Sequence, residues 1–445
     1  MKKYVDAELL KRSLPNDRLE LLHLLAYQAS MLRMPLYLVG GVVRDILLGR
    51  AVNDFDLVVE GDSASFAEYI MKKYGGKILV HPKFGTAAWE INESTLKRLN
   101  VPVFRYINSL LSFDFASARS ETYAQPGALP TVKRAAIDDD LRRRDFTINA
   151  MAFRLDGEHF GELFDPLNGE KDLQDKLIRV LHGKSFMDDP TRILRAVRYA
   201  VRFGFEMDAD TLKLINAEAR GILSQLSGER LRHEFDLMFE EEKIYALLER
   251  LKGLDLLNVI HASLITADPS TLLTAAGQRR RPLNVLVDKP EQEFGEFMTP
   301  DMFSFRQTLG WVLYLLNLSG DEIASIAKRL TFPTLLTKTA RGASSLDKNL
   351  STFMDWKPSQ WTFYLDEIPA LAVYAVYLVS EDQTLLDYLV KWRTIKPNTT
   401  GTDLKNLGLE PGPRYAVILR QLRAAWLDGD VKTEEEEQTL LKKIV

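Results

Sequence analysis

The sequence has 445 residues, of which 46% are hydrophobic and 27% charged, with a formal net charge of −4 and no cysteine. This length suits about two to four domains, and the lack of cysteine excludes disulfides and thiolate metal sites and favours a reducing, cytoplasmic compartment. The negative net charge excludes a uniformly basic nucleic-acid coat, and without an apolar run of about 18 residues or an apolar signal core we expect neither a membrane span nor secretion.

The first part of the chain alternates helical and strand patterns. Helical spacing covers "LELLHLLAYQASML", "PLYLVG" is a short apolar strand, and "VVRDILLG" predicts a helix that Gly49 ends. "DFDLVVEG" predicts a strand, "SASFAEYIMKKYGG" a helix, and "SFDFASAR" a strand with alternating polarity. We therefore predict an α/β head over residues 1–172.

Helical periodicity dominates from about Asp172 to the end. "PTRILRAVRYAVRFGF", "GERLRHEFDLMFEEEKIYALLERLKGL" and "PRYAVILRQLRAAWLDG" are amphipathic helical patterns. We predict an all-α remainder, divided into a neck over 173–244, a body over 245–357 and a tail over 358–445. The last segment, "EEEEQTLLKKIV", predicts a charged helix whose acidic part is a solvated face.

Two aspartates stand close together in "LVGGVVRDILLGRAVNDFDLVVEGD". On a strand, Asp54 and Asp56 point to the same side, and two like charges there repel unless a cation lies between them. The six histidines of the chain are scattered, so carboxylates are the expected metal ligands, which favours magnesium. The alternative is a solvated strand end.

The same segment carries two glycines and an arginine upstream of the aspartates. Gly40 and Gly41 lie between a predicted strand and helix, where absent side chains let backbone N–H groups approach phosphate oxygens. Arg44, one turn into the helix, can add a charged donor. With the aspartates, the pattern predicts a nucleoside-triphosphate and metal site.

The order Gly-Gly-x-Val-Arg-Asp, Leu-Leu-Gly and Asp-x-Asp resembles the nucleotidyltransferase head of class II tRNA nucleotidyltransferases, the CCA-adding enzymes, and of the related bacterial poly(A) polymerases. This resemblance implies a mixed, polymerase-β-like sheet with helices, in which Asp54 and Asp56 bind two catalytic Mg²⁺ ions. A third acid on a later strand often accompanies them in the wider superfamily. Asp114 fits that position by order and strand context; the alternative is an outward-facing strand residue.

A second motif lies in "DDDLRRRDFTINAMAF". Arg143 and Arg144 can hold phosphates of the triphosphate and the primer, and Asp145 can accept a hydrogen bond from a ribose hydroxyl. The alternative is a helix start with Arg–Asp pairs across its turns. Similarity to the family's second motif favours the functional interpretation. The next stretch, "DPLNGEKDLQDKLIR", resembles the third motif and is interpreted as a mainly structural connector.

The stretch "DDPTRILRAVRYAVRFGF" suggests how a base is chosen. Asp189 and Arg192 share one helix face, and an acceptor beside a donor can pair with the Watson–Crick edge of cytosine or, after a small shift, of adenine. The family's Glu-Asp-x-x-Arg motif has this role, and we transfer it to Asp189 and Arg192. Asp188 replaces the glutamate, and its role stays open. The alternative is an acidic cap before a salt-bridged helix.

Arginines continue along the same helix at three- and four-residue steps. Arg195, Arg198 and Arg202 are part of a locally basic stretch, and they either steady phosphates or lie along the helix surface. "GERLRHEF" resembles the fifth motif, in which we interpret Glu229 and Arg230 as supports of the neck.

The tail contains "GTDLKNLGLEPGPRYAVILRQLR", which resembles the element that holds the elbow of tRNA in these enzymes. Four cations there are compatible with phosphate contact: Lys405, Arg414, Arg420 and Arg423. The alternative is a loop and a surface helix. The stretch between about 255 and 395 shows no recognisable chemistry.

These patterns predict a cytoplasmic, template-independent nucleotidyltransferase. It would use Mg²⁺, CTP and ATP to add C, C and A to the 3′ end of tRNA with release of pyrophosphate, and it would bind no membrane and no DNA. Complete CCA addition is the first expectation and CC-only or A-only addition the second, followed by poly(A) synthesis and by a non-catalytic RNA-binding module. "ARSETYAQPGALPTVKR" occupies the place of the flexible loop thought to govern the change to ATP, with Arg119, Glu121 and Tyr123 as candidate lever groups.

Overall fold

The computed structural model describes residues 7–52, 55–81, 85–99, 111–272, 304–353 and 355–445. They fall into two units, Met1–Leu226 and Ser227–Val445. The boundary between the units lies inside the predicted neck, and the division into head, neck, body and tail stays a prediction.

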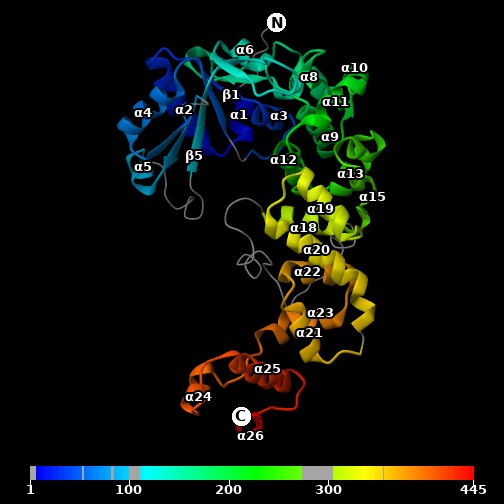
Figure 1. Cartoon of the computed structure of the whole chain (residues 1–445). Helices are drawn as coiled ribbons and strands as arrows, with labels where there is room; N and C mark the ends of the chain where they lie inside the picture. Colours follow the sequence, from blue (N-terminus) through cyan, green and yellow to red (C-terminus); the bar gives the residue numbers. More distant parts are fainter. Residues whose placement is uncertain (1–6, 53–54, 82–84, 100–110, 273–303, 354) are drawn as a thin grey trace. The chain divides into compact units, whose positions relative to one another are not determined.

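A seven-stranded mixed sheet forms the centre of the first unit (Figure 1). β2 and β5 run parallel, and the other neighbouring strands run antiparallel. This arrangement confirms the predicted mixed α/β head. In spatial order the strands are β3 (Lys77–His81), β4 (Thr86–Ile91), β5 (Leu111–Ser117), β2 (Asp56–Val59), β1 (Leu36–Val39), β8 (Ala152–Arg154) and β9 (Glu162–Phe164).

Apolar runs in the sequence become the inner strands of this sheet. All four residues of β1 are buried, as are the last three of β2. Trp89, Phe113 and Phe115 fill the core beside them. The early helices are α1 (Ala7–Ser13), α2 (Asn16–Met31), α3 (Gly41–Leu47), α4 (Ser63–Tyr74) and α5 (Glu93–Arg98). Gly49 follows α3 with a φ of 65°, as expected of a residue that ends a helix.

The segment predicted as a loop over 119–134 forms a hairpin. Its strands are β6 (Arg119–Thr122) and β7 (Thr131–Arg134), with Arg119 opposite Arg134. The turn contains Gly127, whose φ of 71° favours glycine. The Gly127 N–H donates to the carbonyl oxygen of Met187 at 3.0 Å, so the tip of the hairpin is bound to a later part of the same unit.

Short elements and one longer helix complete the first unit. α9 (Thr191–Phe203) buries most of its residues and ends at Gly204, which has a φ of 69°. The other elements are α6 (Ile137–Arg142), η3 (Thr147–Asn149), η4 (Gly157–His159), α7 (Gly169–Gln174), β10 (Leu177–Ile178), α8 (Ser185–Asp188), β11 (Glu206–Met207), α10 (Ala209–Lys213) and α11 (Ala217–Gln225).

The described part of the second unit contains helices and no strand. A stretch predicted as one helix is divided after Phe239, where three consecutive glutamates meet the negative end of the helix dipole. The α-helices are α12 (Gly228–Phe239), α13 (Ile244–Gly253), α14 (Leu256–Ile260), α15 (Ser263–Thr266), α18 (Phe305–Tyr314), α19 (Gly320–Arg329), α20 (Thr334–Asn349), α21 (Pro358–Leu365), α22 (Ala370–Ser380), α23 (Gln383–Val390), α24 (Gly401–Asn406), α25 (Pro413–Leu427) and α26 (Glu434–Ile444). Single turns lie at η6 (Leu350–Phe353) and η7 (Trp392–Thr394).

The prediction of a solvated acidic face on the last helix is wrong at one position. Glu437 on α26 is fully buried and accepts hydrogen bonds from the backbone N–H groups of Asn398 and Thr399 and from the Trp426 indole. These donors hold the pKa of Glu437 below its usual range although burial opposes this. Within the described ranges, no helix combines the length and hydropathy needed to cross a membrane.

Candidate active site

Two aspartates lie side by side on neighbouring parallel strands. Asp56 begins β2, and the register of β2 with β5 places it beside Asp114. Both residues are exposed, whereas the residues that flank them along the strands are buried. Their side chains therefore lie on the same face of two strands about 4.8 Å apart. Asp54 lies outside the described residues.

The chemistry of this pair fits magnesium. Carboxylate oxygens are the ligands that Mg²⁺ prefers, and two adjacent carboxylates are relieved of repulsion by a cation between them. In the described ranges no cluster of three or more His, Asp or Glu side chains is arranged to hold a metal, and Asp54 belongs to none of these ranges. Asp56 and Asp114, with Asp54, are the residues that would hold the metal, and their roles stay predictions.

The two predicted glycines lie next to the aspartate pair. The β1–β2 register pairs Leu38 with Leu57, so the turn that follows β1 lies beside the start of β2. Gly40 has a φ of 74°, and a Cβ atom there would lie 2.6 Å from Nη1 of Arg144. A Cβ atom at Gly41 would lie 3.3 Å from Nη2 of Arg44. Glycine at both positions therefore allows two guanidinium groups to approach the backbone of this turn.

Arg44 is buried and held in one orientation. Its Nε and Nη2 atoms donate to the Asp45 carboxylate at 3.0 and 2.9 Å, and Nη1 donates to Oδ1 of Asn149 at 2.6 Å. The guanidinium carbon also lies 4.5 Å from the ring centre of Phe203. Because each terminal nitrogen carries two hydrogens, one N–H on each has no acceptor among the described residues. These donors are available to a phosphate.

Asp140 organises the second motif. It is fully buried and accepts hydrogen bonds from Nε and Nη2 of Arg143 at 2.9 and 2.8 Å and from Nη2 of Arg144 at 2.9 Å. Burial alone would raise the pKa of Asp140, but the charges of Arg144 and Arg143 outweigh it and hold the pKa below its usual range. The Nε atom of Arg144 is buried without a hydrogen-bond acceptor in the described structure.

Glu121 joins the β6–β7 hairpin to the second motif. Its carboxylate accepts from Nη2 of Arg119 at 3.1 Å, Nη1 of Arg143 at 3.0 Å and the hydroxyl of Tyr123 at 3.0 Å. Burial, aided by the neighbouring Glu121 carboxylate, raises the pKa of Tyr123 to about 12. All three candidate lever groups therefore lie in one polar network with Arg143.

Arg192 lies in the first turn of α9, whereas Asp189 has an extended backbone between α8 and α9. The prediction that the two base-reading residues share one helix face is therefore wrong, because the helix begins only after Pro190. Oδ1 of Asp189 accepts from the backbone N–H and the hydroxyl of Thr191, the first residue of α9, at 3.1 and 2.7 Å. Arg192 is buried, and its guanidinium donates to Oγ of Ser185 and to the carbonyl oxygen of Arg143, both at 2.8 Å. The second motif and the base-reading segment are thus in direct contact.

Asp145 is buried and forms an ion pair with the partly exposed Arg195. Oδ2 of Asp145 accepts from Nε and Nη2 of Arg195 at 2.9 and 2.6 Å, and Oδ1 accepts from Asn149 and from the Phe146 N–H, each at 2.9 Å. These partners outweigh the effect of burial and lower the pKa of Asp145. Arg198 is also buried, with its guanidinium carbon 5.0 Å from the ring centre of Tyr199. In this structure both arginines contact the protein itself, and their predicted nucleotide contacts stay predictions.

Two residues of this site, Asp140 and Asn149, were not predicted from the sequence. Asp140 precedes Arg143 and Arg144 by three and four positions on a helix, a spacing that indicates ion pairs. Asn149 bridges Arg44 and Asp145 through its side-chain amide. The spacing could have revealed Asp140, whereas no local signal identifies Asn149, because one of its partners is distant in the chain.

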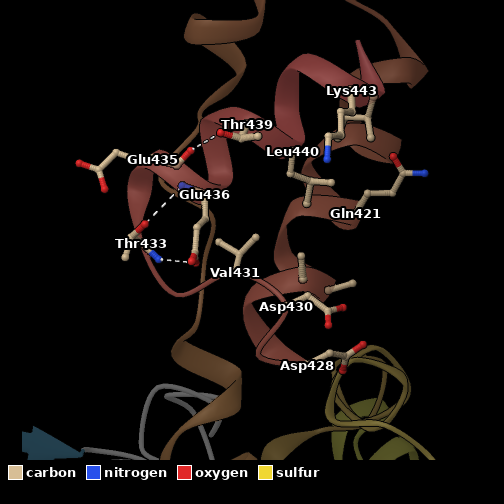
Figure 2. A pocket seen from close by; sticks show the side chains of 13 residues that line it. Gln421, Asp428, Asp430, Val431, Thr433, Glu435, Glu436, Thr439, Leu440 and Lys443 are labelled. Carbon is tan, nitrogen blue, oxygen red and sulfur yellow. Dashed lines mark hydrogen bonds between the residues drawn. The ribbon is translucent and has the colours of Figure 1, made fainter.

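A pocket of about 900 Å³ lies elsewhere, between α25 and α26 of the second unit (Figure 2). Asp428, Asp430, Glu435 and Glu436 contribute carboxylates to its wall, and Lys443 is the one cation that lines it. Carboxylates repel phosphate oxygens, and no predicted nucleotide-binding residue lines this pocket. We therefore do not assign the triphosphate to it.

Two family models match the chain. The model described as the poly A polymerase head domain matches residues 36–179, which contain the aspartate pair, the glycine turn and the second motif. The model described as a probable RNA and SrmB- binding site of polymerase A matches residues 204–265.

Similar proteins match over nearly the whole chain. The A-adding tRNA nucleotidyltransferase of Halalkalibacterium halodurans is 33% identical over 96% of this chain and 93% of its own length. That of Geobacter sulfurreducens is 34% identical over 98% of this chain, which spans 48% of the Geobacter protein. Among solved structures, an apo form of a CCA-adding enzyme is 29% identical with a TM-score of 0.76, covering 99% of this chain and 98% of its own.

Proposed function

The chain belongs to the tRNA nucleotidyltransferase and poly(A) polymerase family, and on that premise we propose that it transfers nucleotides to the 3′ end of tRNA. The observation that carries this proposal is the juxtaposition of the Asp56–Asp114 pair with the glycine turn. Arg44 and Arg144 both reach that turn. Two carboxylates and two guanidinium groups thus lie at one end of the β1–β2 pair, which supports a metal and triphosphate site there.

The proposed chemistry is attack of the tRNA 3′ oxygen on the α-phosphorus of the nucleotide. A bond forms between the 3′ oxygen and the α-phosphorus, and the bond from that phosphorus to the oxygen bridging to the β-phosphate breaks. The hydroxyl proton passes to solvent, and pyrophosphate leaves. Mg²⁺ bound by Asp56, Asp114 and Asp54 would supply charge neutralisation and lower the pKa of the attacking hydroxyl. Arg44, Arg144 and the backbone at Gly40 and Gly41 would bind the leaving pyrophosphate.

Arg192 and Asp189 would select the base. The guanidinium of Arg192 is held by Ser185 and by the Arg143 carbonyl oxygen, so it offers donors in a fixed direction. Adenine presents an acceptor at N1 and a donor at N6, which complement an Arg donor and an Asp acceptor. Protein side chains would then replace a nucleic-acid template.

We propose addition of the terminal A as the specificity of this chain. The support is that the relatives from Halalkalibacterium and Geobacter, which match nearly all of it, are named as A-adding enzymes. Complete CCA addition, the first expectation from the sequence, is the second candidate. It is supported by similarity to a CCA-adding enzyme over almost the entire chain.

Three labelled tRNA transcripts, ending before CCA, after C and after CC, distinguish these candidates. Each is incubated with Mg²⁺ and CTP, ATP or both, and products are resolved at single-nucleotide length. We expect only the CC-ended transcript to grow, by one nucleotide with ATP. Growth of the first transcript by three nucleotides would establish the complete enzyme instead, a stop after two would indicate CC addition, and a long ATP ladder would indicate poly(A) synthesis. No product would refute nucleotidyl transfer and favour an RNA-binding module.

Asp56→Asn tests the metal assignment in the same assay. Loss of a metal-binding carboxylate should reduce extension by at least about 1,000-fold, or ~4 kcal/mol, while tRNA binding is retained. Glu68→Gln removes an exposed carboxylate from α4 and is the matched control. Extension by a clean preparation of the Asp56 variant at the control rate would show that Asp56 holds no catalytic metal.

A further inference from the structure

A groove in the second unit lies in the part of the chain for which the sequence indicated no chemistry. It has a volume of about 690 Å³ and is formed by α19, α20 and the turn before α22. Figure 1 labels α19, α20 and α22 in the second unit. Four of its lining residues recur at four- and three-residue steps along α20 and therefore form one stripe of that helix: Thr334, Lys338, Arg341 and Ser345.

Three cations line this groove. Lys328, in the last turn of α19, is exposed, as are Lys338 and Arg341 on α20. None of the three forms an ion pair or hydrogen bond with another described residue. Glu367 is the one acid in the lining. The groove therefore carries an excess of positive charge that the described protein does not neutralise.

Unlike the three cations of the groove, the arginines of the predicted tRNA-binding element in the tail contact other groups of the protein. Arg423 forms an ion pair with Asp366 at 2.6 Å and donates to the carbonyl oxygen of Ile395 at 2.8 Å. Arg414 donates to the backbone oxygen of Val445 at 2.6 Å, and the guanidinium carbon of Arg420 lies 4.2 Å from a phenylalanine ring centre. For these three arginines, binding a phosphate would therefore compete with contacts inside the tail.

We propose that the groove between α19 and α20 binds the phosphate backbone of tRNA. The inference rests on the proposed function, which makes tRNA the substrate. Unpaired lysine and arginine side chains gain from releasing the counterions of a phosphate chain, and hydroxyl groups such as those of Thr334 and Ser345 suit contacts with phosphate or ribose 2′ oxygens. Such a contact does not depend on the nucleotide sequence of the tRNA, and it adds affinity for parts of the tRNA away from its 3′ end.

The test is the salt dependence of tRNA binding by a triple variant, Lys328→Ala, Lys338→Ala and Arg341→Ala. The dissociation constant of labelled tRNA is measured by fluorescence anisotropy at several salt concentrations. Losing three phosphate contacts should reduce the steepness of log affinity against log salt by about 2.1 to 2.7. Between about 50 and about 200 mM salt, the variant should therefore lose about 20- to 40-fold less affinity than the wild type. Affinity for ATP should be unchanged.

A matched control removes three exposed lysines that do have acidic partners: Lys72→Ala, Lys171→Ala and Lys391→Ala. It changes the net charge equally and should retain nearly the wild-type slope. A wild-type slope in the groove variant, with thermal unfolding unchanged, would overturn the assignment of the groove. Failure of the wild-type chain to bind tRNA at low salt would instead refute the proposed substrate, so the two failures are distinct.

Discussion

Replacing Asp140 with alanine removes the acceptor that holds two arginines of the candidate active site. Asp140 is fully buried, whereas the side chains of Arg143 and Arg144 are 18% and 17% exposed. Breaking a buried ion pair costs about 3–5 kcal/mol, and partial solvation of the arginines reduces this to about 2–3 kcal/mol here. We therefore expect Asp140→Ala to lower the free energy of unfolding by about 2–3 kcal/mol.

The same substitution should weaken ATP binding, because Arg144 is no longer held beside Gly40. A loss of about 1.4 kcal/mol would raise the KM for ATP about tenfold while leaving the KM for tRNA unchanged. Asp140→Asn, which keeps one acceptor oxygen, should lie between the wild type and the alanine variant. Urea unfolding and steady-state extension of CC-ended tRNA measure the two effects.

Asp138→Ala is the matched control on the same helix. Asp138 pairs with Arg142, and their side chains are 44% and 53% exposed, so the loss of stability should not exceed about 0.5 kcal/mol. Equal losses for the Asp138 and Asp140 variants would refute the argument from burial. A normal KM for ATP in Asp140→Ala would refute the positioning of Arg144.

Four other substitutions give separable results. Gly40→Ala should lower the free energy of unfolding by about 1–3 kcal/mol because of the positive φ, and should raise the KM for ATP because the new Cβ would meet Arg144. Gly49 has a φ of 65° and no neighbour within 4 Å, so Gly49→Ala should lower stability without changing the KM. Urea unfolding and steady-state kinetics measure the two effects. Burial raises the pKa of Asp236 to about 6, so the folded chain keeps a proton between about pH 4 and 6 that the unfolded chain releases. The protonated Asp236 therefore stabilises the folded chain fully below about pH 4, and this contribution is lost above about pH 6. Asp236→Asn should remove up to about 3 kcal/mol of pH dependence from the free energy of unfolding measured in urea. An unchanged dependence of that free energy on pH would contradict the raised pKa. Glu437→Gln should lower the unfolding free energy by about 1–3 kcal/mol, because the buried carboxylate accepts several hydrogen bonds, and a loss below about 0.5 kcal/mol would contradict this.

Local features of the site follow from the sequence. The strand that precedes Gly40, the helix that carries Arg44 and the strand that begins at Asp56 were all predicted, as was α9 with Arg192. Each depends on periodicity and turn chemistry within a few residues. Such preferences act through the backbone of the segment itself, so they can be recognised without knowing what the segment packs against.

The partners of these residues were decided by the tertiary structure. Parallel pairing of β2 with β5 brings Asp114 beside Asp56, and the packing of α9 on the second motif joins Arg195 to Asp145. Glu437 looks like its exposed neighbours in the sequence, yet its side chain is buried against groups from other segments. Strand register and burial are set by contacts between segments distant along the chain. The free energy of those contacts, rather than any local preference, determines which charges meet.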